Sequence, residues 1–421
     1  MGQRVLQGAL SWLRTLVSSG EYTDEMIRIE DTLGGERVVF YCAQSKEDCR
    51  MLVDRFRRYD VWALDTESTG INPYRVGWEL RTFQFGRSNV SYVVPARFRH
   101  TIGRIITRRG VKWIGHNGPH DIRSLDVHLG YETGVQCAGE TYILAHHQDS
   151  RKHEDGGIGH GLKELALHHI APDGGKWETA LKKAFKELTI EIPGQVYKSG
   201  PRKGQQKVRK AKYAEGWSLI DPSHPAYIAY AASDPVLTYR LWYTLRHVAE
   251  GSPELYRFDR KVQLACDRLQ RRAIRLDTRY TTRLTVEYTR HAQTMQRVAA
   301  GYGVQSIHSG AQIAKALQTQ GVELIEQTPT GQWAMSDRIM RQIMNEAAPP
   351  SAVYHLLHAV LLAKQLLKRR ESYTEAALRE MDSEGRVHPS INSLAARTAR
   401  MSVSNPPLQQ LPTKDRESDN A

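Results

Sequence analysis

Short apolar runs that alternate with helical patterns between residues 37 and 129 are the feature that most limits how this chain can fold. Five of these runs predict strands: Arg37–Cys42, Val61–Leu64, Leu80–Phe85, Val90–Val94 and Val111–Ile114. A capping-box pattern begins at Ser45, and a helical pattern covers Pro119–Leu129. Strands and helices that alternate in this way predict an α/β fold with a central mixed sheet.

The composition changes after about residue 251, where helical patterns replace the strands. Three helices are predicted at Leu255–Leu276, Thr281–Ala300 and Ser309–Gln320. Pro350 then opens a long helix with an apolar stripe from Val353 to Leu367. The expected domains are an N-terminal segment of unknown role (1–36), an α/β domain (37–250), a mostly α-helical region (251–412) and a polar tail (413–421).

A surplus of basic residues indicates a polyanionic partner. The 421 residues include 59 Lys and Arg against 46 Asp and Glu, which gives a formal net charge of +13. Such cations displace condensed counterions from phosphates, so nucleic acid is the simplest partner, although a protein can also be merely basic. The stretch Lys198–Lys212 carries basic residues and no acid. It is either a solvated mobile loop or a loop that contacts phosphate.

Cysteine and hydropathy patterns argue against several classes of protein. The four cysteines, Cys42, Cys49, Cys137 and Cys266, form no C-x-x-C pair, which argues against a zinc site or a disulfide framework. The first 19 residues lack a secretory signal pattern, and no apolar run approaches the length of a membrane span. We therefore expect a cytoplasmic protein with no membrane partner.

Asp65 and Glu67 directly follow the apolar strand Val61–Leu64. Side chains alternate along a strand, so these two carboxylates point to the same side. Two acids held side by side repel each other unless they are exposed or share a cation. Taken alone, the pair fits either a cation site or an ordinary exposed strand end.

Two further acids lie at the edges of predicted elements. Asp121 follows Asn117 by four residues and lies in a first helical turn, where it could simply complement the helix dipole. Tyr230 and Asp234 share a helical face at i, i+4 spacing. Pro235 leaves a second interpretation, in which Asp234 is the N-cap of a helix that begins at the proline.

In this order the motifs D-x-E, N-x-x-x-D and Y-x-x-x-D resemble the tyrosine type of the DEDD exonuclease superfamily, over roughly Arg37–Ala249. The resemblance implies a ribonuclease H-like fold and 3′–5′ hydrolysis of DNA with two divalent metal ions, Mg²⁺ or Mn²⁺. The metal ligands it implies are Asp65, Glu67, Asp121 and Asp234, and the residue that positions the attacking water is Tyr230. The residues it places beside the terminal nucleotide are Thr66, Ser68, Ile71 and Asn117.

The segment from Thr398 to Pro412 resembles the one that precedes the first catalytic palm motif of family-A DNA polymerases. It departs from the family pattern at Ala399, Val403 and Pro407. It keeps Arg400 and Gln409, which in that family contact the DNA minor groove at the primer end. The helices between residues 255 and 381 then resemble the thumb, which grips duplex DNA. The implied partners are a single-stranded DNA 3′ end and a primer–template duplex.

The palm motifs and the fingers helix of that family are not recognised in the sequence, and we expect a chain that is split, ends early or was truncated. The leading prediction is a proofreading 3′–5′ exonuclease with a thumb, from a phage-type replication polymerase, in the bacterial host cytoplasm if phage-encoded. One alternative is a DNA polymerase whose palm and fingers come from a second chain. Two others are a non-catalytic DNA-binding module and an RNA-processing nuclease of the same superfamily.

Overall fold

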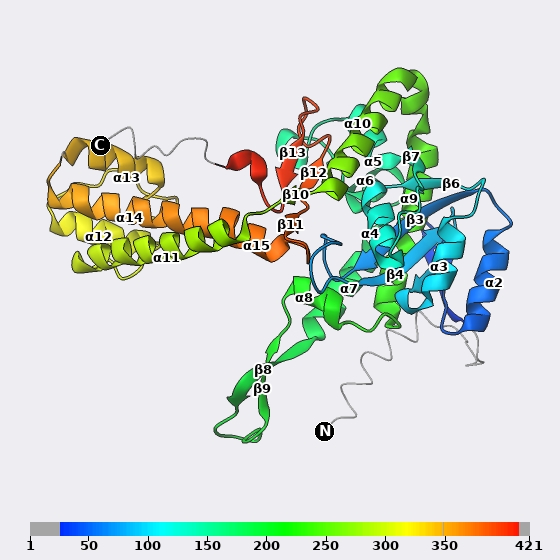
Figure 1. Ribbon diagram of the computed structural model, residues 1–421, viewed down its shortest axis with the longest axis horizontal. Helices are drawn as coiled ribbons and strands as arrows, with labels where there is room; N and C mark the ends of the chain where they lie inside the picture. Colours follow the sequence, from blue (N-terminus) through cyan, green and yellow to red (C-terminus); the bar gives the residue numbers. More distant parts are fainter. Residues whose placement is uncertain (1–25, 348, 412–421) are drawn as a thin grey trace. The chain divides into compact units, whose positions relative to one another are not determined.

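The computed structural model describes residues 26–347 and 349–411 (Figure 1). Most of the N-terminal segment 1–36, together with Pro412 and the tail 413–421, lies outside the described residues. The chain divides into two compact units. The first runs to Arg272 and includes Ile391–Ser402, and the second holds Ala273–Ser390 and the residues from Val403 onward.

A seven-stranded mixed sheet forms the centre of the first unit, in the order β1-β2-β5-β4-β3-β6-β7. Its strands are β1 (Ile27–Leu33), β2 (Glu36–Cys42), β3 (Val61–Ser68), β4 (Leu80–Gly86), β5 (Val90–Pro95), β6 (Lys112–Gly115) and β7 (Cys137–Glu140). β3 pairs antiparallel with β4 and parallel with β6. The five predicted strands and the mixed-sheet α/β class are confirmed.

Two strands of this sheet were not predicted. β1 lies within the segment 1–36, to which no role was assigned, and pairs with β2 along its whole length. It carries Glu30, Asp31 and Thr32 between its apolar ends, so its alternation is weak. β7 has four residues, including Gly139, which are too few to show a period. Pairing with long neighbours, rather than local propensity, makes both segments strands.

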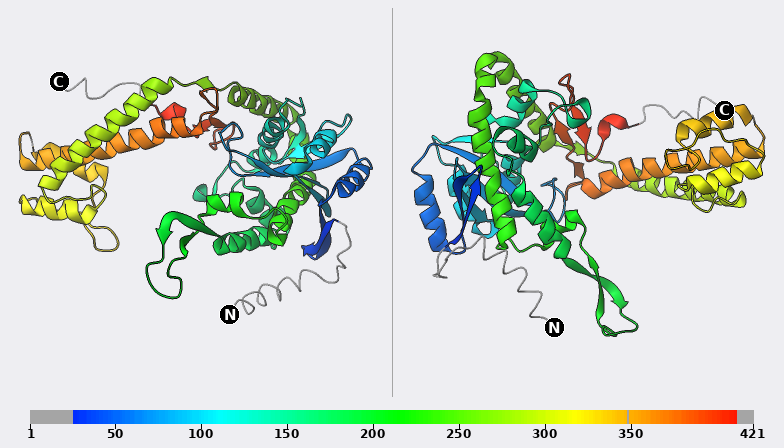
Figure 2. Two further views of the ribbon diagram at one scale, coloured as in Figure 1. Left: turned by 60° about the horizontal axis from the view of Figure 1, so that its bottom comes forward. Right: turned by 180° about the vertical axis from the view of Figure 1, so that it is seen from behind.

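Helices cover both faces of the sheet (Figures 1 and 2). On one face α2 (Lys46–Phe56), α3 (Arg99–Ile106) and α4 (Pro119–Leu129) bury apolar side chains such as Leu52, Ile102 and Leu125. The capping box predicted at Ser45 is present. On the other face α6 (Leu162–His169), α7 (Lys176–Glu187) and α9 (Pro225–Gly251) pack around Trp177 and Tyr227.

The remaining elements of the first unit lead into and out of these layers. They are the short helices η1 (Ala96–Phe98) and η2 (His153–Asp155), α5 (Thr141–Gln148), the hairpin β8 (Thr189–Val196) and β9 (Gln206–Lys210), α8 (Tyr213–Leu219) and α10 (Pro253–Arg272). Part of the stretch Lys198–Lys212 is thus a strand and not a loop. α10 packs on α4, α5 and α9, so this unit extends to Arg272, past the boundary expected near residue 251.

The second unit is mostly helical. Its elements are β10 (Ile274–Arg275), α11 (Thr278–Gly301), α12 (Gly310–Thr319), α13 (Asp337–Ala347), α14 (Ala352–Arg369), the π-helical turn η3 (Arg370–Glu375), α15 (Ala376–Glu380), β11 (Arg386–Val387) and η4 (Leu408–Gln410). Two more short strands are β12 (Ser390–Asn392) and β13 (Ser402–Ser404). The predicted stripe of α14 is buried, including Val353, Leu357 and Leu361. None of the helices in the described ranges is long and apolar enough to cross a membrane.

Candidate active site

The end of β3 presents Asp65 and Glu67 near the middle of the sheet. Their i, i+2 spacing in a strand directs both carboxylates to one side, as predicted. Gln84 lies opposite Asp65 on β4, and its Nε2 donates to Asp65 Oδ2 at 3.3 Å. Glu67 is buried, with 8% of its surface exposed. An exposed strand end is therefore the wrong interpretation of this pair.

Helix α9 brings Asp234 to the same place. The helix begins at Pro225 and contains Pro235 in its interior, so Asp234 lies in the middle of a helix and is not an N-cap. One carboxylate oxygen each from Asp65, Glu67 and Asp234 lie within 4.8 Å of one another. Tyr230 stands one turn before Asp234 on the same helix, as the i, i+4 spacing predicts.

Asp121 lies beside this cluster, in the first turn of α4. The hydroxyl of Thr66 donates to Asp121 Oδ1 at 2.6 Å, which holds α4 against the end of β3. Burial raises the pKa of Asp121 well above its usual range, and the nearby charge of Asp65 raises it further. Asp121 is not one of the three acids whose carboxylate oxygens lie within 4.8 Å of one another. The charge of Asp65 nevertheless acts on Asp121, as the raised pKa shows.

The acids are costly to bury together, and their pKa values report this cost. Burial raises the pKa of Asp65 from 3.8 to about 7. It also raises the pKa of Glu67 well above 4.5, with a further increase from the charge of Asp65. Each acid therefore holds its proton more tightly than in water unless positive charge lies nearby. The arrangement can bind cations through carboxylate oxygens.

Lys163, on α6, supplies one such positive charge and was not identified from the sequence. Its ammonium group pairs with Asp234 and lies 4.5 Å from the centre of the Tyr230 ring. Burial lowers the pKa of Lys163 to about 8, while the charges of Asp65 and Glu67 oppose this effect. In the sequence it is one of many lysines, and no local pattern distinguishes it.

Glu140, at the end of β7, was also missed. It is fully buried, and its two carboxylate oxygens accept hydrogen bonds from the backbone N–H groups of Asn117 and Gly118, both at 2.9 Å. Asn117 has a φ of 65°, a left-handed conformation that a non-glycine residue adopts at a cost. A Cβ on Gly118 would lie 2.4 Å from Cys137 Sγ, so glycine is required there. Glu140 therefore fixes the turn that leads into Asp121.

The residues predicted to touch DNA are spread more widely. The hydroxyl of Ser68 donates to the carbonyl of Gly70 at 2.8 Å. Ile71 is 64% exposed, an unusual position for an apolar side chain beside an acidic strand end. Arg400 is exposed in the segment Ile391–Ser402 of the first unit, and Gln409 is exposed in η4 of the second unit.

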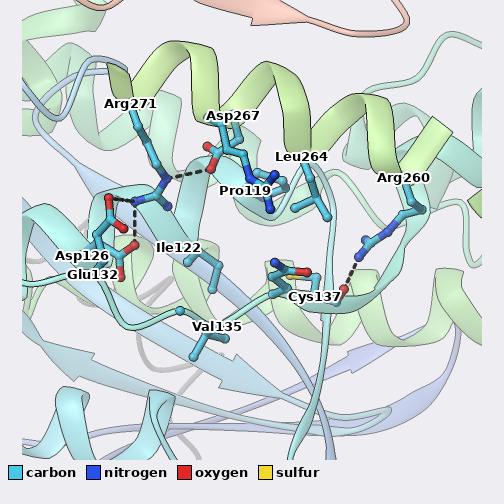
Figure 3. A pocket seen from close by; sticks show the side chains of 13 residues that line it. Pro119, Ile122, Asp126, Glu132, Val135, Cys137, Arg260, Leu264, Asp267 and Arg271 are labelled. Carbon is cyan, nitrogen blue, oxygen red and sulfur yellow. Dashed lines mark hydrogen bonds and ion pairs between the residues drawn. The ribbon is translucent and has the colours of Figure 1, made fainter. Parts of the chain in front are cut away.

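A cavity of about 140 Å³ lies on the other side of α4, against α10 and the segment before β7 (Figure 3). Arg271 crosses one end, with ion pairs to Asp126 and Asp267 at 2.7 Å each. Arg260, at the other end, donates to the carbonyl of Cys137 and lies 3.7 Å from Glu140. None of the acids of the cluster lines this cavity. It belongs to the packing that supports α4.

The α/β sheet of the first unit gathers acids at the end of β3, near the middle of the sheet. Two protein families match different parts of the chain. The family described as 3′-5′ exonuclease matches residues 41–192. The family described as DNA polymerase family A matches residues 278–421. Over these two regions the chain is therefore similar to a family-A DNA polymerase that carries a 3′–5′ exonuclease domain.

Individual relatives agree with this assignment. The DNA polymerases of Mycobacterium phages L5 and D29 are 29% and 30% identical to the chain over 398 and 399 residues. Each match covers 93% of this chain and 62% of the relative, so the chain spans less than two thirds of either polymerase. DNA polymerase I of Chloroflexus aurantiacus is 24% identical, with 87% of this chain and 36% of the relative covered.

The fold itself resembles a solved structure. The polymerase domain of Pol1 from M. smegmatis, in complex with DNA primer-template and dNTP, superposes with a TM-score of 0.54 at 13% identity. The match covers 89% of this chain and 56% of that one. At this identity the likeness shows the fold alone.

Proposed function

We propose that the first unit hydrolyses DNA from its 3′ end and serves in proofreading. The observation that carries this proposal is the convergence of Asp65, Glu67 and Asp234 within 4.8 Å, beside Asp121 and Tyr230. These five residues come from three separate elements, β3, α4 and α9. Their types and order are those that the resemblance to the tyrosine-type exonucleases requires.

The donor set fits hard divalent cations such as Mg²⁺ or Mn²⁺. All of its ligands are carboxylate oxygens, which such cations prefer, and burial raises the pKa of both strand acids. Lys163 brings one positive charge to at least three acids, which leaves negative charge for cations to neutralise. Two cations held there would activate a water and stabilise the leaving 3′ oxygen. Asp65, Glu67, Asp121 and Asp234 are the proposed ligands.

Tyr230 is proposed to orient the attacking water. Burial raises the pKa of its phenol above the usual value of 10, so the hydroxyl keeps its proton at neutral pH. A neutral hydroxyl can hold a water by hydrogen bonding but cannot act as a general base. Lys163, over the Tyr230 ring, helps to fix the ring's position. Asn117 and the exposed Ile71 are proposed to contact the terminal nucleotide.

A cleavage assay tests this function. The purified chain is incubated with Mg²⁺ and 5′-labelled single-stranded DNA, alongside Asp65→Asn and the control Asp60→Asn. Asp60 lies just before β3, and its side chain is 75% exposed. We expect a ladder of progressively shortened labelled products from the wild-type protein and the control, and none from Asp65→Asn. Equal degradation by Asp65→Asn would exclude the metal-ligand role of this acid.

We also propose that the region from residue 278 contributes to templated DNA synthesis, with palm and fingers supplied by further sequence or by a second chain. The match of residues 278–421 to DNA polymerase family A supports this second function. This chain by itself is expected to shorten a primer and not to extend it. Adding all four dNTPs to a primer–template in the same assay checks this, and templated extension by the pure chain would contradict it.

A further inference from the structure

The hairpin formed by β8 and β9, residues 189–210, projects from the first unit (Figures 1 and 2). We call it the basic arm. Its strands pair from Thr189 with Lys210 to Val196 with Gln206. Backbone hydrogen bonds continue to the tip, where the N–H of Tyr197 donates to the carbonyl of Gln205 at 2.9 Å. The arm is therefore an ordered ribbon and not a loose loop.

Positive charge dominates the basic arm and the two residues after it. Seven cations lie between residues 198 and 212, whereas Glu191 is the one acid between residues 189 and 212. Arg209 is paired with Glu215 at 2.7 Å. Within the described part of the chain, Lys198, Lys203 and Lys207 form no ion pair. The seven cations lie at the tip, on β9 and just after it, whereas β8 carries none. A two-stranded ribbon has little core to compensate for the repulsion between them.

An aromatic cluster fastens the base of the arm to the wall of the active site. The N–H of Ala211 donates to the carbonyl of Leu188 at 3.0 Å and closes the base. Phe185 of α7 then packs against Trp217 of α8 at 5.2 Å between ring centres, and Trp217 packs against Tyr230 at 5.7 Å. A Cβ on Gly216 would lie 2.5 Å from the Phe185 ring, which shows how closely α7 and α8 approach.

We propose that the basic arm binds the phosphate backbone of the single strand of DNA whose 3′ end occupies the exonuclease site. The proposal rests on the function proposed above, because it takes DNA as the substrate. Unpaired cations on an ordered ribbon complement phosphates, and Phe185 and Trp217 connect the base of the ribbon to Tyr230. Tyr197, with Arg202 at 5.8 Å from its ring centre, adds a surface on which a base can stack.

The reach of the arm sets which part of the strand it contacts. The eight residues of β8 extend about 26 Å at roughly 3.3 Å per residue. The cations nearest the tip, Lys198, Arg202 and Lys203, therefore lie well away from the reacting end. They bind phosphates several nucleotides from the terminus, so the arm acts on long strands and contributes little to very short ones.

A charge-matched pair of variants tests the proposal. The arm variant changes Lys198, Arg202, Lys203 and Lys207 to Gln. The control variant removes the same charge by changing Lys46, Arg50, Arg57 and Arg58 to Gln, exposed residues on or just after α2. Both are compared with the wild-type full chain in EDTA, where cleavage does not interfere, by fluorescence anisotropy with oligonucleotides of about 5 and about 25 nucleotides. Far-UV circular dichroism checks that both are folded.

We expect the arm variant to bind the long single strand more weakly and to lose most of the affinity difference between long and short strands. The slope of log affinity against log salt should become shallower by about 3, since each single-strand phosphate contact contributes about 0.7. The control variant should keep both the length dependence and the slope.

Two results would overturn the proposal. One is an arm variant whose slope and length dependence equal those of the control, as expected for a solvated ribbon or a protein-docking element. The other is an arm variant that keeps its affinity for the long single strand and loses affinity only for a blunt duplex measured in the same way. Failure of the proposed exonuclease function can be told apart from failure of this proposal. If the chain binds single strands through the arm but degrades none, the binding results stay as expected and only the cleavage assay fails.

Discussion

Replacing Glu140 with Gln tests whether a residue outside the acidic cluster positions it. Glu140 is fully buried, and its two oxygens accept from the N–H groups of Asn117 and Gly118 at 2.9 Å each. Gln has the same shape but offers one oxygen and one NH₂ group. One backbone donor must then face another donor, and Arg260, at 3.7 Å, loses its anionic neighbour.

The magnitude follows from these contacts. A buried N–H left without an acceptor costs about 1–3 kcal/mol, and the surviving bond loses about 1 kcal/mol when its acceptor becomes neutral. The sum is about 3 kcal/mol, which corresponds to a fall in Tm of roughly 6–12 °C for a unit of this size. Cleavage should slow by about 10-fold or more, since the turn that sets Asp121 is released.

Thermal unfolding and single-strand cleavage of Glu140→Gln measure both effects. Glu132→Gln is the matched control, because its side chain is 78% exposed and lies 3.9 Å from Arg271. The control should change stability by less than about 0.5 kcal/mol and leave cleavage intact. If Glu140→Gln unfolds and cleaves like the control, the positioning role is wrong.

Three further predictions concern the acids and their neighbours. Tyr230→Phe should slow cleavage by about 10-fold or more with unchanged affinity for DNA in EDTA; an unchanged rate would leave Tyr230 with a packing role. Lys163→Met should lower the free energy of unfolding in EDTA by about 3 kcal/mol, because it leaves Asp234 without its cation. Mg²⁺ should then stabilise this variant more than it stabilises the wild-type protein. An equal response of both proteins to Mg²⁺ would contradict this prediction. Folding raises the pKa of Asp65 from 3.8 to about 7. The contribution of Asp65 to the stability of the metal-free protein should therefore be largest below about pH 4 and be lost as the pH rises from about 4 through about 7. Asp65→Asn should flatten that part of the pH profile in EDTA, and an unaltered profile would show that Asp65 does not contribute.

Local patterns predicted much of the sheet and its flanking helices. The predicted helix Pro119–Leu129 has the bounds of α4, and the stripe on α14 is buried as its spacing indicated. Alternation and helical spacing are properties of neighbouring residues, so they can be read from a single chain. β1 and β7 could not be predicted in this way, because pairing with distant strands makes them part of the sheet.

The residues of the candidate site also fall into those that local patterns predict and those that only distant contacts bring together. The spacing of Asp65 with Glu67 and of Tyr230 with Asp234 follows from strand and helix periods, and the structure places each pair on one side. Local sequence left open whether Asp234 was a helix cap, and the continuous helix α9 decides against it. Lys163 and Glu140 depend on contacts with Asp234 and with the turn at Asn117, far away in the sequence. No periodic pattern records such contacts.

The most direct test of the central claim is to locate cations in the acidic cluster. Crystals of the chain soaked in Mn²⁺ would be measured near the manganese absorption edge, and an anomalous difference map would be calculated. We predict two peaks about 4 Å apart, one among Asp65, Glu67 and Asp234 and the other beside Asp65 and Asp121. The Asp65→Asn protein should show neither peak at full height. A map of the wild-type protein with no peak at these acids would contradict the proposed metal site.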